Sequence, residues 1–125
     1  MKDSDFSNII YQVVAVRNVA DEENTFLYGA QDSKVTKVFV DYDGFKIQDF
    51  FSGHSSSIRS IDVSKDGTQL ATGCEDHSLR IWDYKTCKAK SMLVGHHGVV
   101  SGGSFLNSNT LVSSSWDMKI MIWKV

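Results

Sequence analysis

Residues 53–83 read GHSSSIRSIDVSKDGTQLATGCEDHSLRIWD and hold three short apolar segments separated by polar ones. Apolar and polar residues alternate within these segments, as in strands that bury one face. Residues 65–68 (KDGT) and 75–78 (EDHS) lie between them and supply the glycine and short polar side chains that favour tight turns. The sequence therefore predicts an antiparallel meander whose strands cover residues 58–63, 69–72 and 79–82.

The same unit returns about 41 to 42 positions further along the chain, in residues 95–123. A repeat of this length is typical of one four-stranded blade of a β-propeller. The matched pairs are Gly53 and Gly95, His54 and His96, Ile58 and Val100, Val63 and Phe105, Leu70 and Leu111, Thr72 and Ser113, Asp76 and Asp117, and Trp82 and Trp123.

With a Gly-His pair opening each unit and a tryptophan closing it, the chain resembles the WD-repeat β-propeller family. The resemblance implies an all-β fold, a partial β-propeller of three blades with four, four and three antiparallel strands. Because a closed ring needs about 4 to 8 blades, we expect this chain to be the carboxy-terminal part of a larger propeller, for which seven blades is one arrangement. The remaining blades would come from a longer chain or from another subunit.

The repeat register also predicts the boundaries between the blades. Asp32 aligns with Asp76 and Val38 with Trp82, but no Gly-His pair precedes them, so the first unit is a degenerate blade. We expect a polar lead-in over residues 1–7, the degenerate blade over 8–52, a complete blade over 53–94, and a blade lacking its outer strand over 95–125.

Composition and charge exclude several classes of function. The 125-residue chain has a net charge of −2 and no basic cluster, so it lacks the positive surface with which proteins bind nucleic acid or anionic membranes. It has no apolar run of membrane-spanning length and no signal-peptide layout. Cys74 and Cys87 form no CxxC pair and have no ligand partners at metal-binding spacing, so we expect free thiols in a reducing, cytoplasmic compartment.

Two polar sets resemble the structural tetrads of the family, in which an indole N–H reaches a hydroxyl, the hydroxyl an imidazole, and the imidazole a carboxylate. A Ser/His/Asp set could instead form a hydrolase triad. The set occurs twice in register, as a repeated fold element does and a unique active site does not, so we expect no enzymatic activity. The sets are His54, Thr72, Asp76 and Trp82, and His96, Ser113, Asp117 and Trp123.

The histidines could also suggest zinc, but the spacing of His54, His77, His96 and His97 fits no zinc ligand pattern. We therefore expect neither a metal nor a cofactor.

The resemblance implies that protein partners dock on the top face of the propeller, at defined positions after the Gly-His pair and before the turn aspartate. Trp116 is the strongest candidate because tryptophan and arginine are enriched at interface hot spots, and Arg59 suggests an acidic partner. The alternatives are that Trp116 packs on its neighbouring blade and that Arg59 is a solvated surface residue. The positions are Ser57, Arg59, Glu75, Val99, Ser101, Trp116 and Gln31.

Two functions follow from the resemblance. The first is a non-catalytic scaffold for protein–protein interaction. The second is a structural component of a large assembly such as the ciliary axoneme or cytoskeleton. This alternative depends on residues 71–84 (ATGCEDHSLRIWDY), residues 43–44 (DG) and residues 122–124 (IWK), which are similar to the ends of WD-repeat proteins of the ciliary doublet microtubule.

Overall fold

The computed structural model describes residues 8–17 and 19–125, and this part of the chain contains strands and turns but no helix. The expected polar lead-in over residues 1–7 lies outside the described residues. The strands are β1 (Ile10–Ala15), β2 (Thr25–Ala30), β3 (Lys34–Asp41), β4 (Gly44–Ser52), β5 (Ile58–Val63), β6 (Gln69–Cys74), β7 (Ser78–Asp83), β8 (Lys88–Val94), β9 (Val100–Asn107), β10 (Thr110–Ser115) and β11 (Ile120–Lys124).

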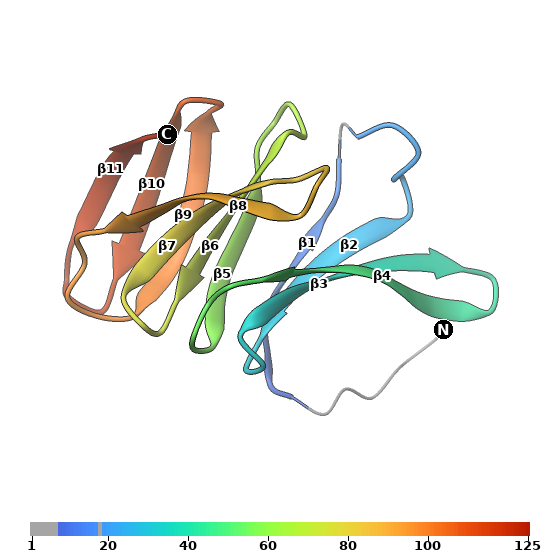
Figure 1. The fold of residues 1–125 in the computed structure, drawn as a ribbon, viewed down its shortest axis with the longest axis horizontal. Helices are drawn as coiled ribbons and strands as arrows, with labels where there is room; N and C mark the ends of the chain where they lie inside the picture. The colour runs from blue at the N-terminus through green and yellow to red at the C-terminus, as the bar shows by residue number, and fades with distance from the viewer. Residues whose placement is uncertain (1–7, 18) are drawn as a thin grey trace.

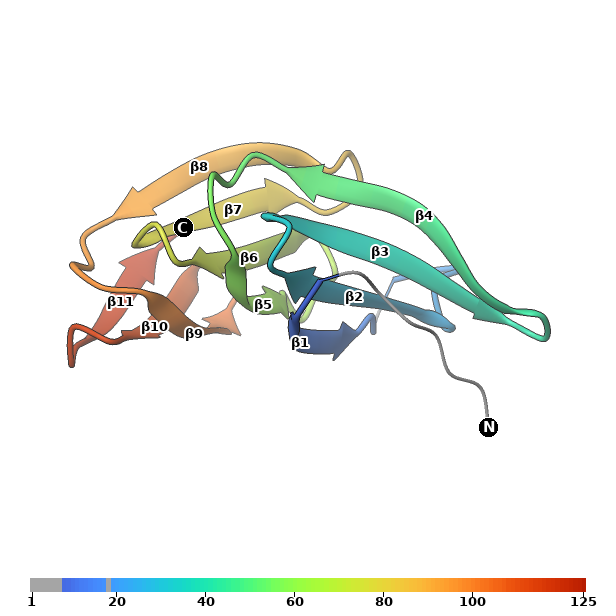
Figure 2. The ribbon, with the colours of Figure 1, turned by 90° about the horizontal axis from the view of Figure 1, so that it is seen from below.

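These strands form three antiparallel sheets in which each strand pairs with its neighbours in the sequence (Figure 1). We call them the first blade (β1–β4), the second blade (β5–β8) and the third blade (β9–β11). The all-β fold with sheets of four, four and three strands is confirmed. Figure 2 shows the outer strands β4 and β8 along one long edge of the molecule, with β1, β5 and β9 along the opposite edge.

The hydrophobic core lies between the blades. One cluster, which includes Leu27, Phe51 and Trp82, joins the first blade to the second. Another, which includes Leu79 and Val100, joins the second blade to the third. The second blade is therefore covered on both faces, and all six residues of β6 are buried. The prediction that its strands bury one face was wrong for β6. The alternation of apolar and polar residues along a strand does not indicate whether another sheet covers its polar face.

Glycine residues allow the closest approach between blades. A Cβ at Gly29 would lie 2.6 Å from Cγ2 of Ile58, and a Cβ at Gly73 would lie 2.6 Å from Cγ1 of Val100 and would also overlap the Ser60 hydroxyl. Gly29 and Gly73 occupy the same repeat position, three residues before the turn aspartate. At this position, the first strand of the following blade packs directly on the backbone of β2 or β6.

Two hydrogen bonds also cross from one inner strand to the next. The side-chain oxygen of Gln12 accepts a bond of 2.8 Å from the N–H of Ile61. The carboxylate of Asp62 accepts a bond of 2.8 Å from the N–H of Phe105. Burial raises the pKa of Asp62, while this N–H bond favours its ionised form. The polar groups at the inner edge thus hold successive blades in register.

The turns between the second and third strands of the blades share one backbone conformation. Ser33, His77 and Met118 each follow a turn aspartate and have φ angles of 65°, 76° and 67°. A positive φ is unusual for residues with a side chain. It is stabilised in the later blades by the aspartates, because Asp76 accepts from the N–H of Ser78 and Asp117 from that of Lys119.

The two end faces of this arc carry exposed apolar side chains. On the first blade, Ile10, Val13, Phe26 and Tyr28 line a shallow hollow of about 250 Å³. On the third blade, Ile120 and Ile122 are 73% and 72% exposed. In a propeller these faces pack on further blades.

We predict that Gly73→Ala lowers the free energy of unfolding by about 1 to 3 kcal/mol, because the added methyl group would overlap both Val100 of β9 and the Ser60 hydroxyl of β5. Gly103→Ala is the matched control, since a Cβ there would lie 3.7 Å from its nearest neighbour, Cδ2 of Leu79. The control should be neutral or stabilising by up to about 1 kcal/mol. Denaturant unfolding measures both changes, and equal effects would show that the blades do not approach so closely.

We also predict that the 125-residue chain self-associates at micromolar concentration through its end faces, because exposed apolar area favours burial by about 25 cal/mol per Å². Ile122→Lys should reduce this association. Met92→Lys, at an exposed position on the outer strand β8, should not. Sedimentation velocity measures the outcome, and a compact monomeric wild-type chain would contradict the prediction.

Candidate functional site

The third blade contains a complete four-residue hydrogen-bond chain. The indole N–H of Trp123 donates to the Ser113 hydroxyl at 2.8 Å, and this hydroxyl lies 2.7 Å from Nε2 of His96. Nδ1 of His96 lies 2.9 Å from the Asp117 carboxylate. Partial desolvation alone would raise the pKa of Asp117, but hydrogen bonds from the His97 N–H and the His96 ring outweigh it and lower the pKa. This set has the arrangement expected for a structural tetrad.

The second blade forms only part of the same chain. Trp82 donates to the Thr72 hydroxyl at 2.9 Å, and Nε2 of His54 is hydrogen-bonded to that hydroxyl. Nδ1 of His54 is buried and has no hydrogen-bond partner among the described residues. Burial lowers the pKa of His54 to about 4, so the imidazole is neutral at pH 7. The expected link from His54 to Asp76 is therefore absent in this structure.

Asp76 instead accepts hydrogen bonds from two serines. Its Oδ1 accepts from the N–H of Ser78 at 3.0 Å and from the Ser78 hydroxyl at 2.5 Å. Its Oδ2 accepts from the Ser55 hydroxyl at 3.0 Å. Desolvation opposes ionisation, but these hydrogen bonds, together with one from the Cys74 thiol, outweigh it and lower the pKa of Asp76 to about 2.

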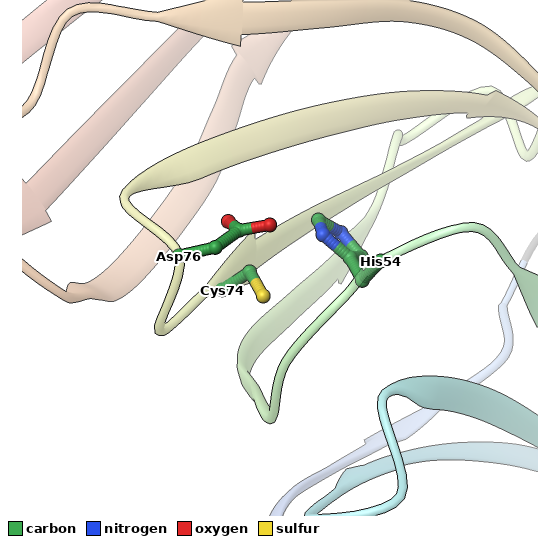
Figure 3. Close-up of side chains that lie close together, drawn as sticks. All are labelled: His54, Cys74 and Asp76. Carbon is green, nitrogen blue, oxygen red and sulfur yellow. The ribbon is translucent and has the colours of Figure 1, made fainter.

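Cys74 lies beside these two residues. The ligand atoms of His54, Cys74 and Asp76 all lie within 4.8 Å of one another, and Figure 3 shows the three side chains facing a common point. Burial raises the pKa of the Cys74 thiol to about 11, and the thiol donates to the Ser56 carbonyl at 3.3 Å. We expected no ligand partners for Cys74, because the sequence has no CxxC pair and no ligands at metal-binding spacing. The repeat alignment could have indicated this grouping, since it places the end of the strand that carries Cys74 beside the loop that carries the Gly-His pair.

In the part of the first blade that the structure describes, no comparable polar chain links the positions that match the tetrads. Val38 occupies the tryptophan position and is fully buried. Asp32 lies at the aspartate position and is partly exposed, with no histidine beside it in the sequence. The apolar residue at position 38 removes the indole donor with which such a chain begins.

The predicted partner-binding residues lie close together across the second and third blades. Nε of Arg59 donates to Glu75 at 2.7 Å, and the two side chains also form an ion pair. The Arg59 guanidinium carbon lies 5.2 Å from the ring centroid of Trp116 and 4.0 Å from that of Tyr11. Trp116 is nonetheless 62% exposed. It therefore contacts a neighbouring blade and also presents most of its ring to solvent.

The other predicted positions support this cluster through their backbones. Ser57 is buried, its hydroxyl donates to the Gln31 carbonyl at 3.4 Å, and its own carbonyl accepts from the N–H of Glu75. The carbonyl of Val99 accepts from the N–H of Trp116 at 3.0 Å. Ser57 is thus placed to join two blades rather than to offer a side chain, whereas Gln31 is exposed.

A cavity of about 530 Å³ opens beside the cluster, at the inner edge of the blades. Arg59 and Tyr11 line it together with small residues of β9, including Ser101 and Gly102, and with residues of β10 and β11. The Ser101 hydroxyl is exposed and lies 3.3 Å from that of Ser114. The cavity thus continues the Arg59 and Trp116 surface towards the inner strands.

The hydroxyls of the polar sets are poorly placed for catalysis. Thr72 and Ser113 are buried, and each hydroxyl oxygen already accepts an indole N–H. A nucleophile must reach a substrate carbonyl from an accessible position. These residues have the burial and bonding of a structural element.

We predict that Ser113→Ala lowers the free energy of unfolding by about 1 to 3 kcal/mol, because it leaves the Trp123 N–H and His96 Nε2 without their shared partner. Ser101→Ala is the control, since its hydroxyl is exposed and should contribute less than about 0.5 kcal/mol. Chemical denaturation compares the two, and a neutral Ser113→Ala would show that the polar chain does not stabilise the blade.

Solved structures with this fold extend well beyond this chain. The structure of U3-55K superposes with a TM-score of 0.84 at 24% identity, over 98% of this chain and 38% of that one. The crystal structure of RRP9 WD40 repeats gives the same score and identity over 98% of this chain and 37% of that one. At this identity the likeness shows the fold, a WD40 propeller. No helix in the described residues is long and apolar enough to cross a membrane.

Sequence relatives have more than one role. The chain is 29% identical over 119 residues to Cilia- and flagella-associated protein 52 of Macaca fascicularis, which covers 94% of this chain and 20% of that protein. It is 29% identical over 126 residues to the Ribosome biogenesis protein WDR12 homolog of Aedes aegypti, which covers 82% of this chain and 30% of that protein. The chain therefore spans less than a third of these relatives.

The family model described as "WD domain, G-beta repeat" matches residues 45–83 and 87–124. Each match ends at or next to the tryptophan that closes a repeat, Trp82 or Trp123. Together the matches cover more than half of the chain, and they confirm the resemblance in the sequence. The chain belongs to the WD40-repeat family.

Proposed function

We propose that this chain is part of a non-catalytic scaffold that binds a protein partner through a surface formed by Arg59, Glu75 and Trp116. WD-repeat proteins generally act as scaffolds for protein interactions. The observation that carries the proposal is that Trp116 stacks beside a charged pair and still exposes 62% of its surface. Tryptophan and arginine are the residues that most often contribute the largest share of binding energy at interfaces.

Arg59 is held in place before any partner arrives. Its guanidinium group lies between the rings of Tyr11 and Trp116, and Glu75 neutralises its charge on one side. Cation–π contacts of this kind contribute about 0.5 to 2 kcal/mol each. Because Arg59 loses little conformational freedom on binding, the surface is preorganised for a partner.

The ion pair with Glu75 also limits which partner fits. An acidic side chain would compete with Glu75 for Arg59, whereas an apolar or aromatic side chain can pack on the open part of the Trp116 ring. We therefore favour a partner segment that places an apolar residue on Trp116 and a hydrogen-bond acceptor near Arg59. This preference revises the acidic partner that Arg59 alone suggests.

A second candidate function is a structural role in a ciliary assembly. Its support is the alignment of 94% of this chain with Cilia- and flagella-associated protein 52 from several mammals, among them Homo sapiens and Mus musculus. The WDR12 relatives are named for ribosome biogenesis and support a role in that process instead. Imaging of the tagged chain in ciliated cells would distinguish an axonemal from a nucleolar or diffuse cytoplasmic location.

We predict that Trp116→Ala weakens binding of the protein partner by about 2 kcal/mol or more, as expected for a hot-spot residue. Cross-linking of the tagged chain in cells, followed by quantitative mass spectrometry, would identify the partner. Titration with the purified partner would then give the affinity of each variant.

Met92→Ala is the matched control, because Met92 is also a large exposed apolar residue, 52% exposed, but lies on the outer strand β8. The control should bind like the wild-type chain. If partners depend on Met92 and not on Trp116, the binding surface is the outer edge of the blade, and the proposed surface is wrong.

A further inference from the structure

His54 offers an unused nitrogen in the interior of the second blade. His54 is 6% exposed, and its Nδ1 has no hydrogen-bond partner among the described residues. A buried polar atom without a partner costs about 1 to 3 kcal/mol, so native structures rarely leave one in that state. Figure 3 shows the imidazole facing the Cys74 sulfur and the Asp76 carboxylate.

The two serines around Asp76 explain why the carboxylate does not satisfy His54 directly. Ser78 donates two hydrogen bonds to Oδ1, and Ser55 donates one to Oδ2. The Cys74 thiol also hydrogen-bonds to this carboxylate, so the roughly four lone-pair sites of Asp76 are used by Ser78, Ser55 and Cys74 rather than by His54. The serines also fix the orientation of the carboxylate, as outer-shell hydrogen bonds do at metal centres.

The third blade has different residues at the positions that match Cys74, Ser55 and Ser78, and its histidine is bonded differently. There Ser115 stands where the second blade has Cys74, His97 replaces Ser55, and Lys119 replaces Ser78. Nδ1 of His96 is then bonded directly to Asp117 at 2.9 Å. The open nitrogen thus occurs in the blade that also carries a thiol and two competing hydroxyls.

We propose that the second blade binds a zinc ion through His54 Nδ1, Cys74 Sγ and a carboxylate oxygen of Asp76. Imidazole, thiolate and carboxylate are all zinc ligands, with zinc–ligand distances of about 2.0 to 2.3 Å. Tetrahedral geometry at those distances separates the ligand atoms by about 3.3 to 3.8 Å. A ring nitrogen of His54, the Cys74 sulfur and a carboxylate oxygen of Asp76 already lie within 4.8 Å of one another, so small side-chain movements bring the ligand atoms into range.

The charges and protons balance at this site. Zn²⁺ replaces the thiol proton of Cys74, which is released to solvent, and the resulting thiolate and the Asp76 carboxylate together neutralise the ion. The ring proton of His54 is then on Nε2, where the Thr72 hydroxyl oxygen accepts it. Asp76 is exposed, so the ion enters from its side, and water completes the tetrahedral set.

The test is titration of the metal-free, reduced 125-residue chain with Co²⁺, followed by displacement with Zn²⁺. We expect one Co²⁺ per chain, with a thiolate-to-cobalt charge-transfer absorption that Zn²⁺ abolishes. Cys74→Ser should remove this absorption and weaken Zn²⁺ binding at least about tenfold, since even outer-shell changes cost that much. Asp76→Asn should also weaken binding.

Cys87→Ser is the matched control, because Cys87 is the other free cysteine and lies outside the cluster. It should leave the absorption unchanged. Cys74→Ser is expected to fold, as Ser115 occupies the same position in the third blade, and circular dichroism checks this. The proposal is overturned if the wild-type chain shows no stoichiometric charge-transfer absorption, or if the absorption depends on Cys87. Either result can be read from the wild-type and Cys87→Ser chains alone.

Discussion

The close approach of β-branched residues to glycine at the blade boundaries is the constraint on which the rest of this structure depends. The Ile58 side chain packs on Gly29 and the Val100 side chain packs on Gly73, so at these points the side chain of one sheet lies directly on the backbone of the other. This spacing allows a hydrophobic cluster to form at each boundary between blades. It also brings the last turn of the third blade near enough for Trp116 to reach Arg59. The surface assigned to partner binding is therefore a product of how the blades pack.

The two polar sets show how one framework supports different chemistry. Both keep the indole and the hydroxyl in contact. Trp82 is fully buried, and Trp123 is partly buried against the cluster between the second and third blades. They differ at the solvent end, where the aspartate has a limited number of acceptor sites. In the third blade the backbone of His97 and the ring of His96 share Asp117. In the second blade, serine hydroxyls donate to the Asp76 carboxylate, and the buried Nδ1 of His54 has no hydrogen-bond partner among the described residues.

The sequence was sufficient for those features that depend on local pattern. The strand predicted over residues 58–63 agrees with β5 at both ends, and the repeat register indicated the sheets of four, four and three strands. Contacts between blades were not predictable, because a repeat alignment does not say which side chains meet across a boundary. The stacking of Arg59 on Trp116 is of this kind. The positive φ of His77 was also missed, since such an angle is expected of glycine.

Every strand in these sheets pairs with a strand adjacent in the sequence. The chain therefore closes only short loops to form a blade, and the entropy lost in doing so is small. Folding rates rise as contacts become more local, so a single blade has a low kinetic barrier to forming its hydrogen bonds. A blade formed in this way still lacks cover for its apolar faces until a neighbour docks. Cooperativity should then spread from blade to blade along the chain, as it does in other repeat proteins.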